Sequence, residues 1–461
     1  MRDGKLDSTY LKRIIKTIGK ENVITEYEDR ICYSYDGTFQ RGIPEVVVFP
    51  GNTGEVAEII KLANIEHIPV SPRGAGTGLS GGSIPEAHGI ALVLTRMNKI
   101  KEISKEDLMA VVEPGVITGH FHQEIEKMGM FYPPDPASLK TCTMGGNVAE
   151  NAGGPRAFKY GVTKDYVLGL EVVTPTGEIM RTGGRTVKNV TGYDLTRLLT
   201  GSEGTLGIIT EITVRLLPKP KDKKTALVYF DQLKDAAKTV TSIIYEGVIP
   251  ATIELMDRVT INCVEKYTKQ GLPLDVEAIL LMEVDGSPAQ VAEDIQIIED
   301  VCKRNNCRNT EIASAYEERE RLWKARRAVS SAIVQLKPTK ISEDATVPRS
   351  KIPEMVKSLK EIGTKYQLHL PVFGHAGDGN LHPNILADKN DHDEMERVEK
   401  AVGEIFQAAL ALGGTLSGEH GIGIMKKPYL QWELGEVGLN YLRAIKKAVD
   451  PNNILNPGKI F

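Results

Sequence analysis

The fold is decided by residues 71–82, SPRGAGTGLSGG, which follow a β-strand pattern and contain five glycines. Within this stretch, GTGLSG matches the G-x-G-x-x-G spacing of a dinucleotide-binding loop. In a Rossmann fold such a loop opens a helix whose N-terminus binds the pyrophosphate. Here residues 83–89 contain a proline and a glycine, and residues 90–95 predict another strand. The pattern therefore excludes a Rossmann fold.

The segments around this loop predict a β-α-β unit. Residues 45–49 predict a strand, Thr53 is expected to N-cap a helix that runs to Glu66, and a second strand starts at Ile68. Successive glycine N–H groups in the loop can form an anion-binding nest, and Arg73 adds positive charge. The alternative interpretation is a long flexible turn without a ligand.

A second glycine-rich tract, residues 133–161, makes a lone phosphate-binding turn insufficient. Its centre, residues 134–154, reads PDPASLKTCTMGGNVAENAGG. The glycines allow close backbone approach, and the small polar residues and two asparagines supply hydrogen-bond partners. This composition suits a flat heterocycle with a carbonyl and N–H edge, such as an isoalloxazine.

Two further glycine-rich motifs predict a metal site: GHAGDGNLH at residues 374–382 and SGEHGIG at residues 417–423. They offer three or four nitrogen and oxygen ligands, and three protein ligands with an open position are typical of a catalytic metal site. After the Asp-Gly turn, residues 380–387 predict a strand with His382 and Asn384 on one face. The alternative is that these histidines only cap loops, but three of the nine histidines lie inside these two motifs.

The composition is that of an ordinary globular protein and excludes several classes. A length of 461 residues predicts two or three domains. A net charge of -4 argues against a nucleic-acid or anionic-membrane surface, and no apolar run approaches a membrane span. The five cysteines are scattered without a Cys-x-x-Cys, which disfavours disulfides and iron–sulfur clusters and fits a reducing, cytoplasmic location.

The charged, proline-rich segment 218–224 predicts the main domain boundary. Residues 8–28 predict an amphipathic helix ahead of it. Beyond it the sequence predicts an α+β domain, with strands at 225–230 and 278–285, helices at 232–247 and 288–306, and a last helix at 437–449.

Taken in order, these motifs resemble those of FAD-linked oxidases with the vanillyl-alcohol oxidase/p-cresol methylhydroxylase fold. The resemblance covers nearly the whole chain. It is greatest to the branch of D-lactate dehydrogenases, glycolate oxidase flavoprotein subunits and D-2-hydroxyglutarate dehydrogenases, including lactate dehydrogenase subunits of electron-confurcating complexes. The motifs that carry it are PRGAGTGLSGG, PPDPASLKTCTMGGNVAENAGGPRAFKYG, GSEGTLGIIT, GHAGDGNLHPN, SGEHGIG and the terminal NPGK.

The resemblance implies an α+β fold with a two-part FAD-binding domain, an α+β substrate (cap) domain and a C-terminal helical segment that returns to the flavin. The expected parts are an N-terminal helical segment (1–40), the FAD-binding domain (41–218), the substrate domain with the metal site (219–425) and the C-terminal segment (426–461).

In this family the first loop wraps the FAD pyrophosphate, the second tract lies against the flavin ring, and later motifs pack about the adenine side and ribityl chain. The residues implied are Arg73, Gly74, Gly76, Thr77, Gly78, Gly81 and Gly82 in the first loop; Pro134, Asp135, Ser138, Thr141, Thr143, Gly145, Asn147, Asn151 and Gly154 in the second tract; Tyr160, Gly161, Glu203, Gly204, Thr205, Gly207, Ile208 and Ile209 about the adenine side and ribityl chain; and Asn456 in the C-terminal turn. Because the first loop has no histidine, and near relatives bind FAD non-covalently, we expect non-covalent FAD.

The resemblance also implies a divalent metal ion and a catalytic set. The metal ligands fall on His375, His382 and Glu419, Asn384 matches a substrate-carboxylate ligand, and His420 matches the catalytic base. Mixed histidine and glutamate ligation suits Zn²⁺, Fe²⁺ or Mn²⁺. Arg326 matches the family arginine that pairs with the substrate carboxylate, a bidentate contact. Lys340 lies within a residue or two of a lysine that binds substrate in dicarboxylate-specific relatives.

The implied reaction is oxidation of a D-2-hydroxy acid to the 2-oxo acid, with D-lactate first, then glycolate and D-2-hydroxyglutarate. The electrons then need an external acceptor, and the resemblance favours a protein such as electron-transferring flavoprotein. Two interpretations from other classes remain. A metallohydrolase would leave residues 1–218 without a task, and a non-catalytic flavin subunit would leave the metal motifs unexplained.

Overall fold

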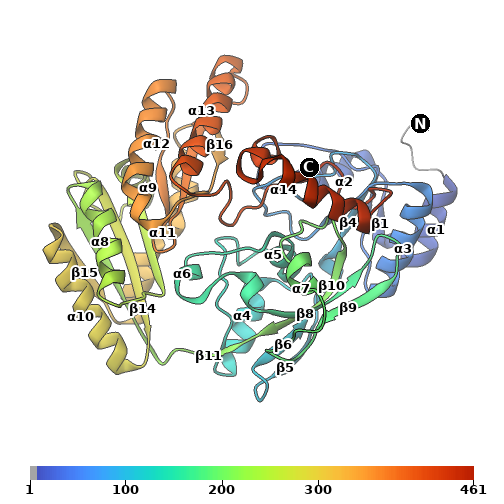
Figure 1. The fold of residues 1–461 in the computed structure, drawn as a ribbon, viewed down its shortest axis with the longest axis horizontal. Helices are drawn as coiled ribbons and strands as arrows, with labels where there is room; N and C mark the ends of the chain where they lie inside the picture. The colour runs from blue at the N-terminus through green and yellow to red at the C-terminus, as the bar shows by residue number, and fades with distance from the viewer. Residues whose placement is uncertain (1–7) are drawn as a thin grey trace. The chain divides into compact units, whose positions relative to one another are not determined.

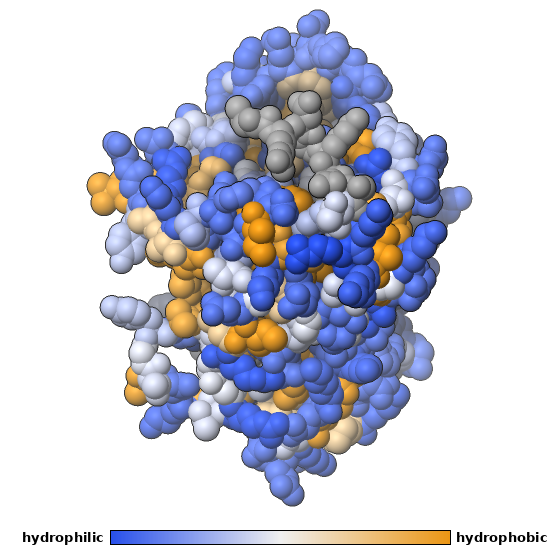
Figure 2. All heavy atoms as spheres, turned by 90° about the vertical axis from the view of Figure 1, so that its right-hand side faces the viewer, coloured by the Kyte–Doolittle hydropathy of each residue, from blue (hydrophilic) through white to orange (hydrophobic). Residues whose placement is uncertain are grey.

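The computed structural model describes residues 8–461, which divide into two compact units (Figure 1). Unit 1 combines the chain up to residue 152 with residues 162–219 and 419–461, and unit 2 consists of residues 153–161 and 220–418. The face in Figure 2 is mainly hydrophilic, with small separate hydrophobic patches. Within residues 8–461, no helix has both the length and the apolar composition that a bilayer crossing needs.

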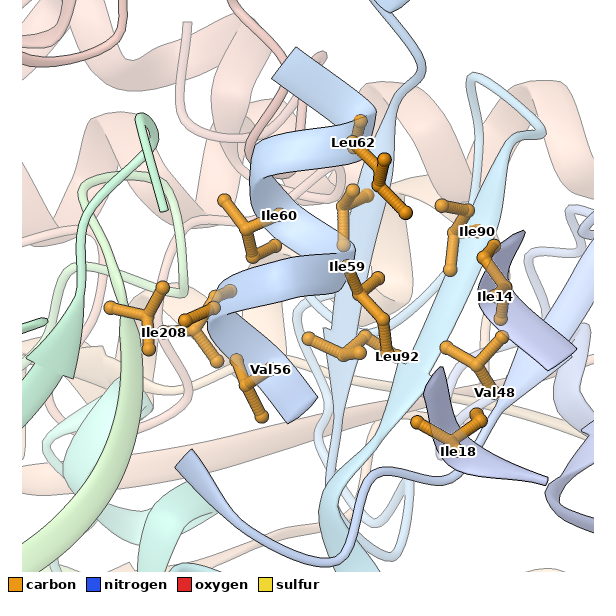
Figure 3. Packing of buried hydrophobic residues seen from close by; sticks show 14 of the residues in the cluster. Ile14, Ile18, Val48, Val56, Ile59, Ile60, Leu62, Ile90, Leu92 and Ile208 are labelled. Atoms are coloured by element: carbon orange, nitrogen blue, oxygen red, sulfur yellow. The ribbon is translucent and has the colours of Figure 1, made fainter. Parts of the chain in front are cut away.

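The first sheet of unit 1 is built from the predicted β-α-β unit. Its strands are β1 (Val23–Ile24), β2 (Val46–Val48), β4 (Ile90–Val93) and β3 (Val70–Arg73), in that spatial order, with β2 and β3 parallel to β4. Helix α3 (Thr53–Glu66) connects β2 to β3. Its buried Val56 and Ile59 lie in one hydrophobic cluster with Leu92 of β4 (Figure 3). Contrary to the prediction, Asn52 rather than Thr53 caps this helix, because its side chain accepts a hydrogen bond from the Glu55 N–H.

The N-terminal helix is shorter than predicted. Helix α1 (Ser8–Ile18) ends before Gly19, whose φ of 85° is incompatible with a continuing helix. A short turn, β1 and α2 (Tyr27–Arg30) follow. The first seven residues of the predicted N-terminal segment lie outside the described residues.

The second sheet of unit 1 is antiparallel. Its spatial order is β5 (Ile100–Ser104), β6 (Met109–Val112), β10 (Ile208–Arg215), β8 (Val167–Val173) and β9 (Ile179–Gly183). Helices α4 (Thr118–Lys127), α5 (Met144–Glu150) and α7 (Leu195–Leu199) accompany it, and β7 (Met130–Phe131) pairs with β11 (Leu217–Pro218).

The C-terminal segment returns to the first sheet of unit 1. Helix α14 (Leu430–Val449) begins before the predicted residue 437 and is kinked at Gly435, where φ is 65°. Beyond it, the Val70 N–H donates to the Ile454 carbonyl at 2.7 Å, and the Asn456 N–H donates to the Val70 carbonyl at 2.8 Å. Residues 454–456 therefore pair in parallel beside Val70, the first residue of β3, the strand that leads into the first glycine-rich loop.

Unit 2 is an antiparallel sheet with helices packed against it. The strands run in the order β15 (Cys307–Ala313), β12 (Asp222–Phe230), β14 (Ala278–Gly286), β13 (Thr252–Asp257), β18 (Val372–His375), β19 (Asn380–Ala387) and β16 (Thr339–Ser342), with β17 (Ala345–Thr346) paired to β19. The helices are α6 (Ala157–Tyr160), α8 (Leu233–Tyr245), α9 (Arg258–Thr268), α10 (Pro288–Arg304), α11 (Tyr316–Ile333), α12 (Ile352–Tyr366) and α13 (His392–Ala411). The predicted strands and helices of this region are confirmed. Strands β13 and β19 are buried along their whole length, so a polar side chain in them requires a partner.

Candidate functional site

Two adjacent strands of unit 2 bring the predicted metal-ligating histidines together. His375 ends β18, and His382 lies in β19, which matches the predicted strand 380–387. The register places His382 opposite Phe373, and the rings of His375 and His382 lie 4.9 Å apart between centroids. Gly379, with a φ of 85°, makes the tight turn between the strands.

Glu254 of β13 was not predicted, and it joins the metal motif to Arg326. The register of β13 and β18 sets Glu254 directly opposite His375. One carboxylate oxygen accepts from Nδ1 of His375 at 2.5 Å, and the other accepts from Nε of Arg326 at 2.5 Å. When Nδ1 of His375 donates to Glu254, Nε2 is the ring nitrogen that would bind a metal ion.

The electrostatics of this group favour an ionised Glu254. Its side chain is fully buried, and burial alone would raise its pKa. The positive charge of Arg326 and the contact with His375 outweigh burial, so the pKa lies below its ordinary value. Arg326 also stacks over the Phe373 ring, at 4.9 Å from its centroid. With Nε bound to Glu254, its two terminal NH₂ groups can donate to a carboxylate.

His375, His382 and Glu419 form a group whose ligand atoms all lie within 4.8 Å of one another. The backbone before Glu419 is tightly packed, because a Cβ on Gly418 would lie 2.3 Å from Oγ1 of Thr346. Two imidazole nitrogens and a carboxylate oxygen are a donor set that suits Zn²⁺, Fe²⁺ or Mn²⁺. The residues therefore fit a divalent metal ion. His420, the predicted base, follows Glu419 and is partly buried.

Asn384 and Lys340 lie on adjacent strands near this group. Asn384 is fully buried; its NH₂ group donates to the His382 carbonyl at 2.8 Å, and its oxygen has no hydrogen-bond partner among residues 8–461. A buried oxygen without a partner favours a ligand at this position. On β16, the Lys340 ammonium donates to Oγ of Ser330 at 2.7 Å, and burial lowers the pKa of Lys340.

In unit 1, the glycine-rich motifs converge as a site for FAD requires. A Cβ on Gly74 would lie 2.3 Å from Oγ1 of Thr143, so the first loop touches the second tract. A Cβ on Gly204 would lie 2.3 Å from Cγ of Pro72, which brings the third motif to the end of β3. The NH₂ group of Asn456 donates to the carbonyls of Gly82 (2.8 Å) and Glu203 (2.7 Å), while its buried oxygen has no partner in the described chain.

The first loop has the backbone of an anion-binding nest. None of the N–H groups of residues 74–79 donates a backbone hydrogen bond to another described residue. Gly76 has a φ of 71°, and a Cβ there would lie 2.0 Å from the Arg73 guanidinium. Burial lowers the pKa of Arg73, which lies beneath the loop. Free amides and a neighbouring cation fit a pyrophosphate.

The other predicted cofactor contacts divide between the two units. Thr143 caps α5, Asn147 donates to Thr118 at 2.8 Å, and Asn151 accepts from the Lys164 N–H at 2.9 Å. The remaining unit 1 positions lie in the same motifs: Thr77, Gly78, Gly81, Pro134, Asp135, Ser138, Thr141, Gly145, Thr205, Gly207, Ile208 and Ile209. Gly154, Tyr160 and Gly161 instead belong to unit 2, where the Tyr160 hydroxyl lies 2.8 Å from both carboxylate oxygens of Asp285.

The sequence contained a signal for the unpredicted Glu254. Residues 252–257 read TIELMD, a strand pattern in which a single glutamate interrupts apolar residues. A charged residue in a buried strand indicates an ion pair or a functional site. Its partners remained hidden because they lie 72 and 121 residues away.

Comparisons with known proteins identify the family of both parts of the chain. Residues 44–183 match the FAD binding domain family, and residues 219–460 match the family of FAD linked oxidases, C-terminal domain. The glycolate oxidase subunit GlcD of Bacillus subtilis is 49% identical over 451 residues, which cover 98% of this chain and 96% of that protein. The D-lactate dehydrogenase of Anaerostipes hadrus is 38% identical over 458 residues, which cover 96% of each chain.

Similar solved structures show the same fold. The structure of p-cresol methylhydroxylase with substrate bound superimposes with a TM-score of 0.83 at 20% identity, and covers 99% of this chain and 98% of that one. A 4-ethylphenol oxidase from Gulosibacter chungangensis gives a TM-score of 0.81 at 19% identity, with the same coverage. The chain therefore belongs to the FAD-linked oxidases, and it is an FAD-linked oxidoreductase of the glycolate oxidase GlcD and D-lactate dehydrogenase type.

Proposed function

We propose that this protein oxidises a short D-2-hydroxy acid, with D-lactate as the first candidate and glycolate as the second. The observation that carries the proposal is Glu254, which holds His375 on one side and Arg326 on the other. Glu254 thereby fixes His375, the proposed metal ligand, and Arg326, the proposed carboxylate-binding residue, relative to each other. A 2-hydroxy acid needs both, because its hydroxyl and carboxylate are adjacent.

In this reaction the residues of the chain bind the substrate and move its proton. His375, His382 and Glu419 would hold the metal ion, which when bound lowers the pKa of the substrate hydroxyl. Arg326 and Asn384 orient the carboxylate. His420 removes the hydroxyl proton, a contribution of about 10²–10⁴-fold for a positioned base. The loops of unit 1 would hold FAD non-covalently, and the bound flavin would supply the acceptor for the hydride of the α-carbon.

The activity test is a panel of D- and L-2-hydroxy acids given to the holoprotein without oxygen. We expect D-lactate or glycolate to bleach the flavin absorbance and L-lactate to fail. Equal rates with both lactate enantiomers would contradict the proposal. Acid precipitation of the same protein should release FAD into the supernatant.

The position of Lys340 favours a second class of substrate, a dicarboxylic 2-hydroxy acid such as D-2-hydroxyglutarate. Lys340 contacts Ser330, one helical turn from Arg326, and thus places another cation near the carboxylate-binding group. A lysine there would pair with the distal carboxylate. If Lys340→Met lowers kcat/KM for D-2-hydroxyglutarate but not for D-lactate, the dicarboxylate is the substrate.

We also propose that the reduced flavin passes its electrons to a protein such as electron-transferring flavoprotein. The support is the resemblance of the motifs, together with an exposed segment of unit 1 that carries apolar side chains. In residues 185–195, Val190 is 98% exposed and Tyr193 is 96% exposed. Val190→Ser/Tyr193→Ser should slow reduction of electron-transferring flavoprotein while dye reduction stays unchanged. Rapid reduction of NAD by the protein alone would contradict a protein acceptor.

A further inference from the structure

Unit 1 contains a second buried carboxylate cluster that the proposed reaction does not use. Glu150 ends α5, and Glu203 lies in the GSEGTLGIIT motif. Both lie beside the backbone of Gly421: a Cβ there would be 2.2 Å from Oε2 of Glu150 and 3.0 Å from Oε1 of Glu203. We call Glu150 and Glu203 the acid pair. Only a glycine fits between them.

Glu203 binds the backbone of the SGEHGIG motif with both carboxylate oxygens. The Ile422 N–H donates to Oε1 and the Gly423 N–H donates to Oε2, each at 2.7 Å. Burial raises the pKa of Glu203, and the two backbone N–H bonds oppose that shift because they favour the ionised carboxylate. Together the two bonds fix two consecutive peptide units in one geometry. Those peptides begin three residues after Glu419 and two after His420.

Glu150 supports this arrangement from the other side. Its Oε1 accepts a hydrogen bond from the Ser80 hydroxyl at 3.2 Å, while Oε2 is buried without a partner among the described residues. Burial raises the pKa of Glu150 well above its usual value, and the charge of Glu203 raises it further. A neutral Glu150 can lie beside an ionised Glu203 without repulsion.

We propose that Glu203, supported by Glu150, is a positioning residue: it anchors the backbone of Ile422 and Gly423 and thereby fixes the loop that carries Glu419 and His420. This inference rests on the proposed roles of Glu419 and His420. It also changes the predicted role of Glu203 from a contact near the cofactor to an anchor of the metal and base loop. The glycine-rich motifs of unit 1 then have a second task besides FAD binding.

The test compares Glu203→Gln with Glu113→Gln, measured as purified holoproteins. Glutamine can accept one of the two amides, but its NH₂ group faces the other, so one bond is lost. Glu113 is a matched control, because it is also buried in unit 1 and accepts a backbone N–H, that of Lys99, at 2.8 Å. Hydrogen exchange in a peptide that covers residues 419–426 measures directly whether the Ile422 and Gly423 amides are held. Metal content measures whether Glu419 remains in place.

We expect Glu203→Gln to speed exchange of the Ile422 and Gly423 amides at least about 10-fold, with FAD retained. Metal affinity should fall about 10-fold or more, as it does when a supporting residue is lost, and excess metal should partly restore flavin reduction. If Glu203 only stabilised the fold, excess metal would not restore flavin reduction in the variant. Glu113→Gln should leave exchange in this peptide and metal content unchanged.

If the Ile422 and Gly423 amides exchange at the same rate in Glu203→Gln and in Glu113→Gln, Glu203 does not anchor this backbone. Loss of FAD from Glu203→Gln without a change in that rate would also contradict the proposal. If Glu203→Gln does not fold, Glu150→Ala provides the same comparison, because it removes the carboxyl beside Gly421. If wild-type flavin is not reduced by any 2-hydroxy acid but the exchange effect remains, the proposed function fails and the anchor stands.

Discussion

The pKa values of two carboxyl groups in this protein, Glu254 in unit 2 and Glu150 in unit 1, are shifted in opposite directions. In unit 2, Glu254 is enclosed by the positive Arg326 and by His375, and its pKa lies below the ordinary value despite burial. In unit 1, Glu150 lies beside another carboxylate, and burial together with that charge raises its pKa. Burial acts to raise the pKa of both carboxyls, so the sign of the neighbouring charge determines the direction of the net shift.

The difference indicates what each region is built to bind. Glu254 contacts a histidine and an arginine. In the proposed function these two residues would bind a cation and a carboxylate, so unit 2 would supply charged groups to the reaction. The acid pair holds backbone, and unit 1 presents glycine amides that suit a phosphate. The predictions below test this contrast.

The largest effect should follow removal of the metal ligands. His382→Ala should abolish metal binding and slow substrate-driven flavin reduction at least about 100-fold, because a bound ion would stabilise the negative charge that develops on the substrate hydroxyl. FAD should stay bound, because its loops lie in unit 1. Metal analysis and anaerobic flavin bleaching measure both quantities. His392→Ala, an exposed histidine of α13, is the control, and a His382→Ala protein with normal metal content and rate would show that the site is misassigned.

The second effect concerns the charge of Glu254. Glu254→Gln leaves Arg326 buried without its counter-ion, which should cost about 3 kcal/mol of unfolding free energy in unit 2. Metal affinity should fall about 10–100-fold, because His375 loses the group that orients it. Urea unfolding and metal titration measure these changes. Glu283→Gln is a matched control, since Glu283 is buried in β14 and accepts from Trp323 at 3.1 Å; an equal loss of metal affinity there would remove the special role of Glu254.

The third prediction uses pH to separate the two kinds of carboxyl. Because the folded pKa of Glu150 is raised, its contribution to stability is present below the unfolded pKa of about 4.3 and is lost as pH rises through the folded pKa. Glu150→Gln removes this titration, so the variant should become more stable relative to wild type as pH rises. The loss is about 1.4 kcal/mol for each pH unit by which the folded pKa exceeds the unfolded pKa. Urea midpoints from about pH 5 to 9 measure it, and parallel curves for the two proteins would refute a raised pKa.

The smallest effect on stability should come from the first loop. A Cβ on Gly78 would meet only Oε1 of Glu150, at 3.7 Å, so Gly78→Ala should change the unfolding free energy by less than about 0.5 kcal/mol. If the loop wraps the pyrophosphate, the methyl group should nevertheless weaken FAD retention several-fold. Flavin released on gel filtration measures it. Gly184→Ala, where a Cβ meets nothing within 4 Å, should retain FAD fully.

Local sequence patterns predicted the elements of this fold well. The strand at 380–387 has the predicted bounds, and α8 and α10, the two helices of unit 2 with predicted bounds, begin and end within two residues of them. Helix α5 was not expected, because Gly145 and Gly146 lower helix propensity. Close packing in the folded structure requires one of these glycines, because a Cβ on Gly145 would lie 2.5 Å from Cβ of Pro114.

The candidate site was predictable only in part. The two glycine-rich motifs predicted a metal site, and their resemblance to the FAD-linked oxidases implied the ligands His375, His382 and Glu419, which the structure brings together. It did not identify Glu254 or the anchoring contact of Glu203, because each joins residues from distant parts of the chain through strand register and loop packing. Hydrogen bonds between such residues leave no local periodicity in the sequence.

The return of the C-terminal segment to β3 has a consequence for synthesis on the ribosome. Most of unit 2, residues 220–418, is continuous and emerges before residues 419–461 are made. Unit 1 is completed later, because Val70, the first residue of β3, bonds to Ile454 and Asn456, and the side chain of Asn456 holds the first loop at Gly82. We therefore expect FAD to bind only after the C-terminal residues are made, and a chain that stops before Asn456 should leave the ribosome with unit 2 folded and without FAD.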